Sequence, residues 1–214
     1  MQLYSYFRSS AAYRVRIALN LKGLPYETVP VHLLKDGGQQ LAPAYRELNP
    51  SALVPTLVNG DLALGQSLAI IEYLDETHPQ APLLPSDPAG RARVRAIAQS
   101  IACDLHPLNN LRVLKYLKHE MKVEEEAKNA WYRHWVRVGL DSLEAMLANS
   151  PQTGRFCHGD APTLADLCLV PQLYNARRFD CDLSGVPTLV RIDEACRALP
   201  AFDAAAPEKQ PDAQ

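Results

Sequence analysis

Arg8, Ser9 and Ser10 follow one another at the point where an alternating segment, LYSYF, gives way to a helical pattern. The first turn of a helix has backbone N–H groups without intrahelical partners and carries about half a positive charge. Such a turn, with a hydroxyl donor beside it, favours a thiolate over a thiol. This turn has no cysteine, so a ligand must supply any thiolate held there. The serines could instead only cap the helix, and periodicity leaves both interpretations open.

Two further segments have features of a binding site for a peptide. Val54 precedes Pro55, where a cis peptide bond could expose backbone N–H and C=O groups, although cis is the minority state of X–Pro bonds. Gln66 and Ser67 open another helical segment, and a helix N-terminus favours anions. Three such turns at one edge of a sheet would suit a ligand that has both amide and carboxylate groups.

The segments around these turns predict a small α/β domain. Strand-like and helical segments alternate at 3–7, 10–21, 26–33, 40–48, 55–64 and 68–78. Gly23 ends the first helix, Asn59-Gly60 forms a type I′ hairpin turn and Ser67 caps the last helix. This order indicates a mixed sheet of four strands, of which the last two are antiparallel.

The second half of the chain reads as a separate, all-helical domain. The segment HPQAPLLPSDP contains four prolines and cannot continue the preceding helix. Helical periods follow at 87–121, 124–149, 163–179 and 188–199. We therefore expect a first domain at 1–80, a linker at 81–87 and a helical domain at 88–214. Thr163 and Asp166 have the spacing of a capping box, which accounts for Asp166 without a catalytic role.

The composition of the 214 residues excludes several classes of function. The net charge of −2 offers no field for nucleic acid or a membrane surface, and no apolar run is long enough to cross a bilayer. The five cysteines are widely spaced and include no CxxC, which argues against a disulfide framework or a zinc site. The N-terminus lacks the layout of a secretion signal, so we expect a cytoplasmic protein without a metal site.

Four segments carry a resemblance to a known family: SSAAYRVRIAL, LVPTL, QSLAIIEYLDE and TLADLCLVPQ. They resemble the glutathione transferase superfamily and, within it, the zeta class of maleylacetoacetate and maleylpyruvate isomerases. The similarity continues through LKDGGQQ, HPLNNLRVLKYL and NARRFDCDL to the QPD near the C-terminus, so it covers essentially the whole chain. The resemblance implies a thioredoxin-like N-terminal domain, an all-helical C-terminal domain, a homodimer and glutathione as cofactor.

The resemblance also implies roles for residues at matching positions. Ser9 would activate the thiol, with Ser10 close by, and Arg178 would bind the substrate, with Arg177 as its rival. Arg8 directly precedes the thiol site, so we expect its guanidinium to bind the carboxylate or enolate of the substrate together with Arg178. The residues implied to contact glutathione are Ser9, Ser10, Ala11, Gln40, Val54, Gln66, Ser67, Asp104, His106, Asn110 and Arg112, some of the last four from a partner subunit. The family often has cysteine where this chain has Ala11, which excludes any mechanism that needs an enzyme thiol there.

The reaction that the resemblance implies is the cis–trans isomerisation of maleylacetoacetate or maleylpyruvate. Addition of the glutathione thiolate makes the carbon–carbon double bond single, so that the molecule can rotate before the thiolate leaves. Two other functions stay open: a general transferase that conjugates electrophiles or α-halo acids, and a non-catalytic interaction module. A thioredoxin-type redox protein is disfavoured because the first helical turn lacks cysteine.

Overall fold

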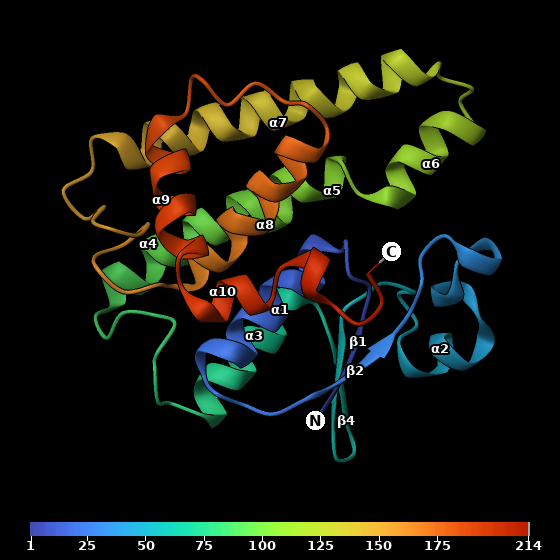
Figure 1. Ribbon diagram of the computed structural model, residues 1–214, viewed down its shortest axis with the longest axis horizontal. Coiled ribbons are helices and arrows are strands. Elements are labelled where there is room, and N and C mark those ends of the chain that lie inside the picture. Colours follow the sequence, from blue (N-terminus) through green and yellow to red (C-terminus); the bar gives the residue numbers. More distant parts are fainter. Residues whose placement is uncertain (214) are drawn as a thin grey trace. The chain divides into compact units, whose positions relative to one another are not determined.

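A computed structural model describes residues 1–213, which form two compact units (Figure 1). The first unit consists of Met1–Leu83 together with the segment that starts at Ala198, and the second is Leu84–Arg197. The sequence prediction had assigned all of 88–214 to the helical domain. In the structure, the segment from Ala198 onward packs with the first unit instead.

The first unit is built on a sheet of four strands in the order β2-β1-β3-β4. β1 is parallel to β2 and antiparallel to β3, and β3 and β4 form a hairpin. This confirms the predicted thioredoxin-like arrangement with a mixed sheet. The strands are β1 (Gln2–Ser5), β2 (Glu27–Pro30), β3 (Thr56–Asn59) and β4 (Leu62–Gly65).

Helices cover both faces of this sheet. Figure 1 shows α1 (Ser10–Leu21) and α3 (Ser67–Thr77) on one side and α2 (Pro43–Leu48) on the other. Leu3, Ile17, Leu57 and Ile70 are fully buried in this unit. Each such side chain contributes about 1.5–3 kcal/mol when it leaves water, so the start of α1 rests on a firm core.

Helix α1 has the bounds that the sequence predicted, and it ends at Gly23 for the expected reason. Gly23 has a positive φ of +63°, and the N–H of Leu24 donates to the carbonyl of Leu19 at 2.9 Å. This left-handed residue closes the helix and turns the chain toward β2.

Two local details of the first unit differ from the prediction. Asn59 belongs to β3, so the hairpin turn consists of Gly60 and Asp61, and only Gly60 has a positive φ. The predicted type I′ turn at Asn59-Gly60 is therefore wrong. Gln66 is the N-cap of α3 and makes no side-chain capping bond, whereas Ser67 is the first helical residue.

The second unit is helical throughout its regular structure. The predicted helices at 124–149, 163–179 and 188–199 are confirmed, but the single helix predicted for 87–121 is wrong. The elements are α4 (Pro88–Gln99), a π-helical turn (Ser100–Leu105), α5 (His106–Leu108), α6 (Leu111–His119), α7 (Glu125–Ala148), α8 (Leu164–Arg178) and α9 (Pro187–Arg197).

The break in the predicted long helix has a local cause. Pro107 has no N–H for a helical hydrogen bond and lies in the short helix α5, which ends at Leu108, and Asn110 is extended (φ −64°, ψ 145°). The Oδ1 of Asn110 then accepts a hydrogen bond from the N–H of Arg112 at 3.1 Å and caps a new helix, α6. The apolar periodicity continues across this break, so the sequence pattern did not reveal the break.

The start of α8 confirms the predicted capping box. The carboxylate of Asp166 is fully buried and accepts hydrogen bonds from the N–H groups of Thr163 and Cys157, both at 2.8 Å. Burial raises the pKa of Asp166, and these hydrogen bonds oppose that rise. Asp166 therefore fixes the loop before α8.

No helix among residues 1–213 combines the length and the apolar character that a bilayer-spanning segment needs. The same residues contain no group of three His, Cys, Asp or Glu side chains placed to share a metal ion. None of the five cysteines forms a disulfide among the described residues, and all five lie in the second unit.

Candidate active site

The turn between β1 and α1 makes Ser9 the N-cap residue of α1. Its backbone is extended (φ −69°, ψ 115°), and its Oγ accepts a hydrogen bond from the N–H of Ala12 at 3.2 Å. A hydroxyl that accepts a hydrogen bond through a lone pair keeps its proton, so it can also donate. Ser9 can therefore cap the helix and donate to an anion at the same time, and the two interpretations of this turn are compatible.

The neighbours of Ser9 differ in how accessible they are. Ser10 is 5% exposed, whereas Ser9 and Ala11 are both half-buried. Arg8 is exposed, and its guanidinium lies over the ring of Phe7, 4.8 Å from the centroid. Ser9 is therefore the more accessible hydroxyl of the pair, with a cation directly before it.

A buried arginine links the start of α3 to α1. Arg14 on α1 is 2% exposed, and its Nη1 donates to the Oγ of Ser67 at 3.2 Å. Gln66, directly before Ser67, has φ +65° and ψ 110°. This backbone conformation costs a non-glycine residue about 1–3 kcal/mol, and such positions cluster at ligand sites. The structure thus brings Gln66 and Ser67 to a strained helix start that is tied to the Ser9 helix.

The segment around Val54 is held by hydrogen bonds from Tyr45, in α2, and from Asn49, which follows α2. The Val54–Pro55 peptide bond is cis. The hydroxyl of Tyr45 donates to the carbonyl of Leu53 at 2.6 Å and lies 3.0 Å from the Oγ1 of Thr56. The Nδ2 of Asn49 donates to the same two oxygens, each at 2.9 Å. Burial raises the pKa of Tyr45, so its hydroxyl keeps its proton. The backbone of Val54 is therefore fixed in place.

Gln40 lies in a 3-10 turn (Gln39–Leu41) that precedes α2, where the sequence had predicted the helix itself to start. It is 9% exposed, and its Oε1 is buried without a hydrogen-bond partner among the described residues. An unpaired buried acceptor costs about 1–3 kcal/mol, so this oxygen is suited to an N–H group from a ligand.

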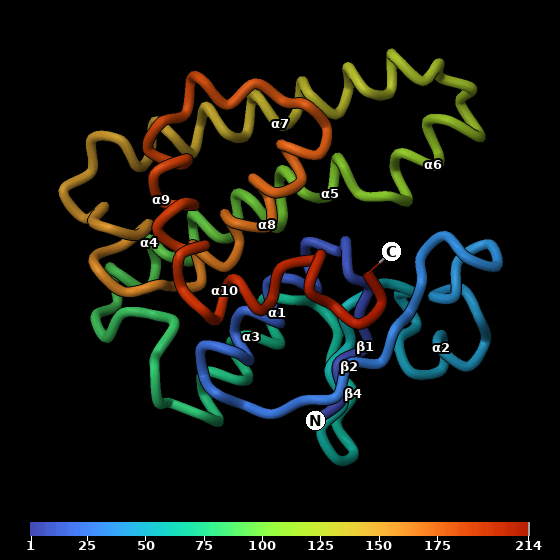
Figure 2. The backbone as a smooth tube through the Cα atoms, viewed as in Figure 1, coloured from blue at the N-terminus to red at the C-terminus, as the bar shows by residue number. Residues whose placement is uncertain are grey.

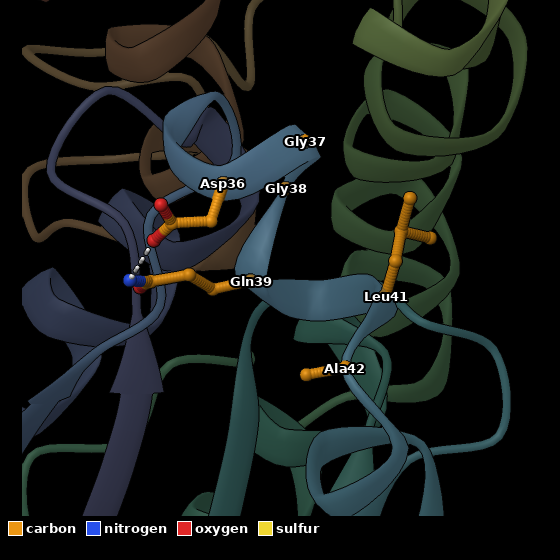
Figure 3. Close-up of a pocket in the computed structure, with 6 residues that line it drawn as sticks. All are labelled: Asp36, Gly37, Gly38, Gln39, Leu41 and Ala42. Carbon is orange, nitrogen blue, oxygen red and sulfur yellow. Dashed lines mark hydrogen bonds between the residues drawn. The ribbon is translucent and has the colours of Figure 1, made fainter.

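The loop before Gln40 forms a hollow of about 410 Å³ (Figure 3). Asp36 and Gln39 lie on one side of it, joined by a hydrogen bond of 3.5 Å, and Leu41 projects away from them. Gly38 has φ +116°, and a Cβ on it would lie 2.7 Å from the Nε2 of Gln40. The bare backbone of Gly38 therefore packs directly on the Gln40 amide.

Four predicted site residues lie near the π-helical turn of the second unit. The Nε2 of His106 is 3.3 Å from the Nδ2 of Asn110, so the structure brings these two side chains together. Asp104, in the π-helical turn, and Arg112, in α6, are both exposed. π-Helical turns are rare and often occur at functional sites.

The two neighbouring arginines at the end of α8 have different partners. The Nη2 of Arg177 donates to the Oδ2 of Asp193, which is fully buried, at 2.7 Å. Arg178 makes no hydrogen bond or ion pair with the described residues, and its guanidinium lies 4.7 Å from the centroid of the Phe179 ring. Arg177 is therefore engaged in the fold, whereas the donors of Arg178 are available to a ligand.

Sequence reasoning missed three residues that support these positions: Arg14, Tyr45 and Asn49. Arg14 and Arg16 stand in the otherwise apolar pattern of RVRIAL, and charged residues at positions that the helical period buries are a signal of buried hydrogen bonding. Tyr45 and Asn49 carry no comparable signal, because their partners at 53–56 are identified only by the fold.

The first unit matches the family model described as glutathione S-transferase, N-terminal domain, over residues 3–82. The chain is 56% identical over 211 residues to a probable maleylacetoacetate isomerase of Vibrio cholerae, an alignment that covers 99% of this chain and 97% of the relative.

Two solved structures are similar over almost their whole length. The holo structure of a maleylpyruvate isomerase, described as a bacterial glutathione S-transferase of the zeta class, is 50% identical with a TM-score of 0.97 over 100% of both chains. A maleylacetoacetate isomerase from Anaeromyxobacter dehalogenans, with bound dicarboxyethyl glutathione and citrate in its active site, is 46% identical with a TM-score of 0.87, covering 100% of this chain and 97% of that one.

Proposed function

The chain belongs to the zeta class of glutathione transferases, and we propose that it isomerises maleylacetoacetate or maleylpyruvate with glutathione, using Ser9 as the thiol-activating residue. The observation that carries this assignment is the geometry of Ser9, which caps α1 through its oxygen and retains its proton for a second hydrogen bond. Ala11 follows in the same turn, so the enzyme itself supplies no thiol there.

Glutathione, when bound, supplies a thiolate that adds reversibly to the substrate double bond and allows rotation about it. The role of Ser9 is to donate its hydroxyl proton in a hydrogen bond to that sulfur. The N-terminus of α1 adds about half a positive charge, which favours the ionised form. Ser10 is buried and supports the same turn from inside.

The residues of the first unit are suited to hold the rest of the glutathione molecule. The unpaired Oε1 of Gln40 accepts a peptide N–H, and the fixed backbone of Val54 pairs with the peptide. Gln66 and Ser67 hold the γ-glutamyl carboxylate at the start of α3, where free N–H groups favour an anion. The buried Oε1 of Gln40, which has no partner among the described residues, supports this assignment.

We assign the substrate carboxylate and the developing enolate to Arg8 and Arg178. A guanidinium forms paired hydrogen bonds with a carboxylate. Neither arginine side chain has a hydrogen bond or ion pair among the described residues, and each lies over a phenylalanine ring instead. The chemistry of dicarboxyethyl glutathione, named in the relative from Anaeromyxobacter, supports the route, since a thiol added across a butenedioate double bond has that connectivity. Asp104, His106, Asn110 and Arg112 remain candidates for contacts to glutathione.

The test is an assay on gel-filtered enzyme with both substrates, with and without added glutathione. We expect turnover only when glutathione is present, and unchanged glutathione concentration after many turnovers. Ser9→Ala should lower kcat by roughly 10- to 100-fold, because a hydrogen bond to a charged group contributes about 1.5–3 kcal/mol. Ser9→Thr keeps the hydroxyl and should retain most of the activity. Full activity of Ser9→Ala would remove Ser9 from the mechanism.

We include in the proposal that the enzyme is a cytoplasmic homodimer, as the family resemblance implies. One chain has a mass of 23.7 kDa. Light scattering of the purified protein should therefore give about twice that mass, and a mass that matches one chain would contradict this part.

A further inference from the structure

The backbone of Phe7, which leads into the Ser9 turn, is held by two charged side chains. The N–H of Phe7 donates to the Oδ2 of Asp212 at 2.9 Å, and the Nη2 of Arg16 donates to the carbonyl of Phe7 at 3.1 Å. Both backbone groups of Phe7 are thereby satisfied by side chains, one from α1 and one from the far end of the sequence. Ser9 is only two residues further along.

The C-terminal segment that carries Asp212 is itself firmly built. It contains α10 (Pro200–Ala204) and a 3-10 turn (Pro207–Lys209), and Figure 2 shows it running across α1 toward the end of β1. Gln210 is buried, and its Nε2 donates to the carbonyls of Ala204 and Ala206 at 3.0 and 2.9 Å.

The end of this segment also packs on the site. Ala213 packs against the buried cluster formed by Tyr6, Phe7, Val31, Tyr45 and Val54. This cluster includes Val54, assigned above to the peptide of glutathione, and Tyr45, which fixes it.

The carboxylate of Asp212 also interacts favourably with the buried cation of Arg16. Arg16 is fully buried, and its Nε and Nη1 donate to the carbonyl of Ala205 at 3.0 Å and the Oγ of Ser5 at 3.2 Å. A buried guanidinium is costly without an opposite charge nearby. Burial lowers the pKa of Arg16 to about 10, and Asp212 is among the groups that oppose this.

We propose that Asp212 is a positioning residue, which fixes the Phe7 peptide from the C-terminal segment so that Ser9 presents its hydroxyl to the glutathione sulfur. Its catalytic consequence rests on the function proposed above, but its effect on the turn does not. A small displacement of a catalytic group is enough to lower the rate substantially, which is why a support outside the first turn of α1 matters.

The experiment compares Asp212→Ala, Asp212→Asn and Asp203→Ala. Asn keeps an oxygen that can accept from Phe7, whereas Ala removes it. Asp203 is a matched control, since it lies in the same segment but is exposed and pairs with Lys209. The first readout is hydrogen exchange of the Phe7 amide in the free protein, which needs no ligand or activity.

We expect faster exchange at Phe7 in Asp212→Ala, and near-native exchange in Asp212→Asn and Asp203→Ala. In the loaded enzyme, Asp212→Ala should lower kcat roughly tenfold and raise the thiol pKa of bound glutathione, followed by thiolate absorbance, and Asn should restore most of both. Unchanged exchange at Phe7 in Asp212→Ala would overturn the proposal, as would faster exchange with native kcat and thiol pKa. If the wild type binds glutathione but does not turn over either substrate, the proposed function is contradicted. The exchange rate at Phe7 then decides the positioning role of Asp212 by itself.

Discussion

Alanine at Arg177 should destabilise the protein, whereas alanine at Arg178 should weaken substrate binding and leave the fold almost intact. The Oδ2 of Asp193 accepts hydrogen bonds from Arg177 at 2.7 Å and from Arg197 at 3.1 Å, while its Oδ1 is buried without a partner. Removal of one partner from a buried ion pair costs about 3–5 kcal/mol. Because Arg197 remains and the Arg177 side chain is 36% exposed, we expect about 2–3 kcal/mol.

That loss can be measured as a thermal shift. For a chain of this size, 1 kcal/mol corresponds to about 2–4 °C, so the midpoint of Arg177→Ala should fall by roughly 4–12 °C. Arg178 contributes a contact with the Phe179 ring, which is worth about 0.5–1 kcal/mol, so its midpoint should fall by no more than about 4 °C.

The kinetic effects should have the opposite order. Arg178→Ala should raise KM for the substrate by a factor of roughly 10–100, since a hydrogen bond between charged groups contributes about 1.5–3 kcal/mol. The affinity for glutathione should stay nearly native. A raised substrate KM in Arg177→Ala with an unchanged midpoint would refute the assignment of the two arginines.

The same pair predicts a pH dependence. Burial raises the pKa of Asp193, and the two arginines lower it, so removal of Arg177 raises it further. A carboxyl whose pKa is raised in the folded state favours its protonated form there. The folded protein therefore loses stability as the pH rises through that pKa. The difference in midpoint between Arg177→Ala and the wild type should therefore shrink as the pH falls from 7 toward about 4. A difference that stays constant would show that the charge of Asp193 is not its source.

Two further substitutions probe the glutathione site. Gly38→Ala should weaken glutathione binding by roughly tenfold in calorimetry, because the new Cβ displaces the Gln40 amide; Gly37→Ala, also at positive φ but with no atom within 4 Å, should have a smaller effect. Equal losses would mean that backbone strain alone is responsible. Asn49→Ala removes two hydrogen bonds on either side of Val54, so it should weaken glutathione binding and cost about 2–3 kcal/mol. A lower thermal midpoint with native affinity would limit Asn49 to a structural role.

The parts of the site that the sequence predicted are those with local signals. Ser9, Gly23 and the Thr163–Asp166 box are marked by residue types that satisfy backbone groups within one turn, and these predictions are confirmed as caps and ends. The same logic failed at Asn59, because Asn59-Gly60 and Gly60-Asp61 are both residue pairs typical of tight hairpin turns and composition does not choose between them.

The parts that the sequence did not predict depend on distant partners. Asp212 and Phe7 are 205 positions apart, and nothing near either residue indicates the other. The choice between Arg177 and Arg178 required the position of Asp193, which is set by the packing of α9 on α8. The break before α6 was hidden because apolar periodicity records burial and is insensitive to a single extended residue such as Asn110.

The absence of any cysteine from the first unit has a consequence for the enzyme under oxidising conditions. A mixed disulfide forms only when a protein thiolate attacks the disulfide of oxidised glutathione. With Ala11 in the first turn of α1, the oxidised tripeptide finds no such nucleophile in the unit to which we assign its binding. Oxidised glutathione would therefore compete reversibly with glutathione for this site. The site would become free again when reduced glutathione is restored, and no reductase would have to act on the first unit.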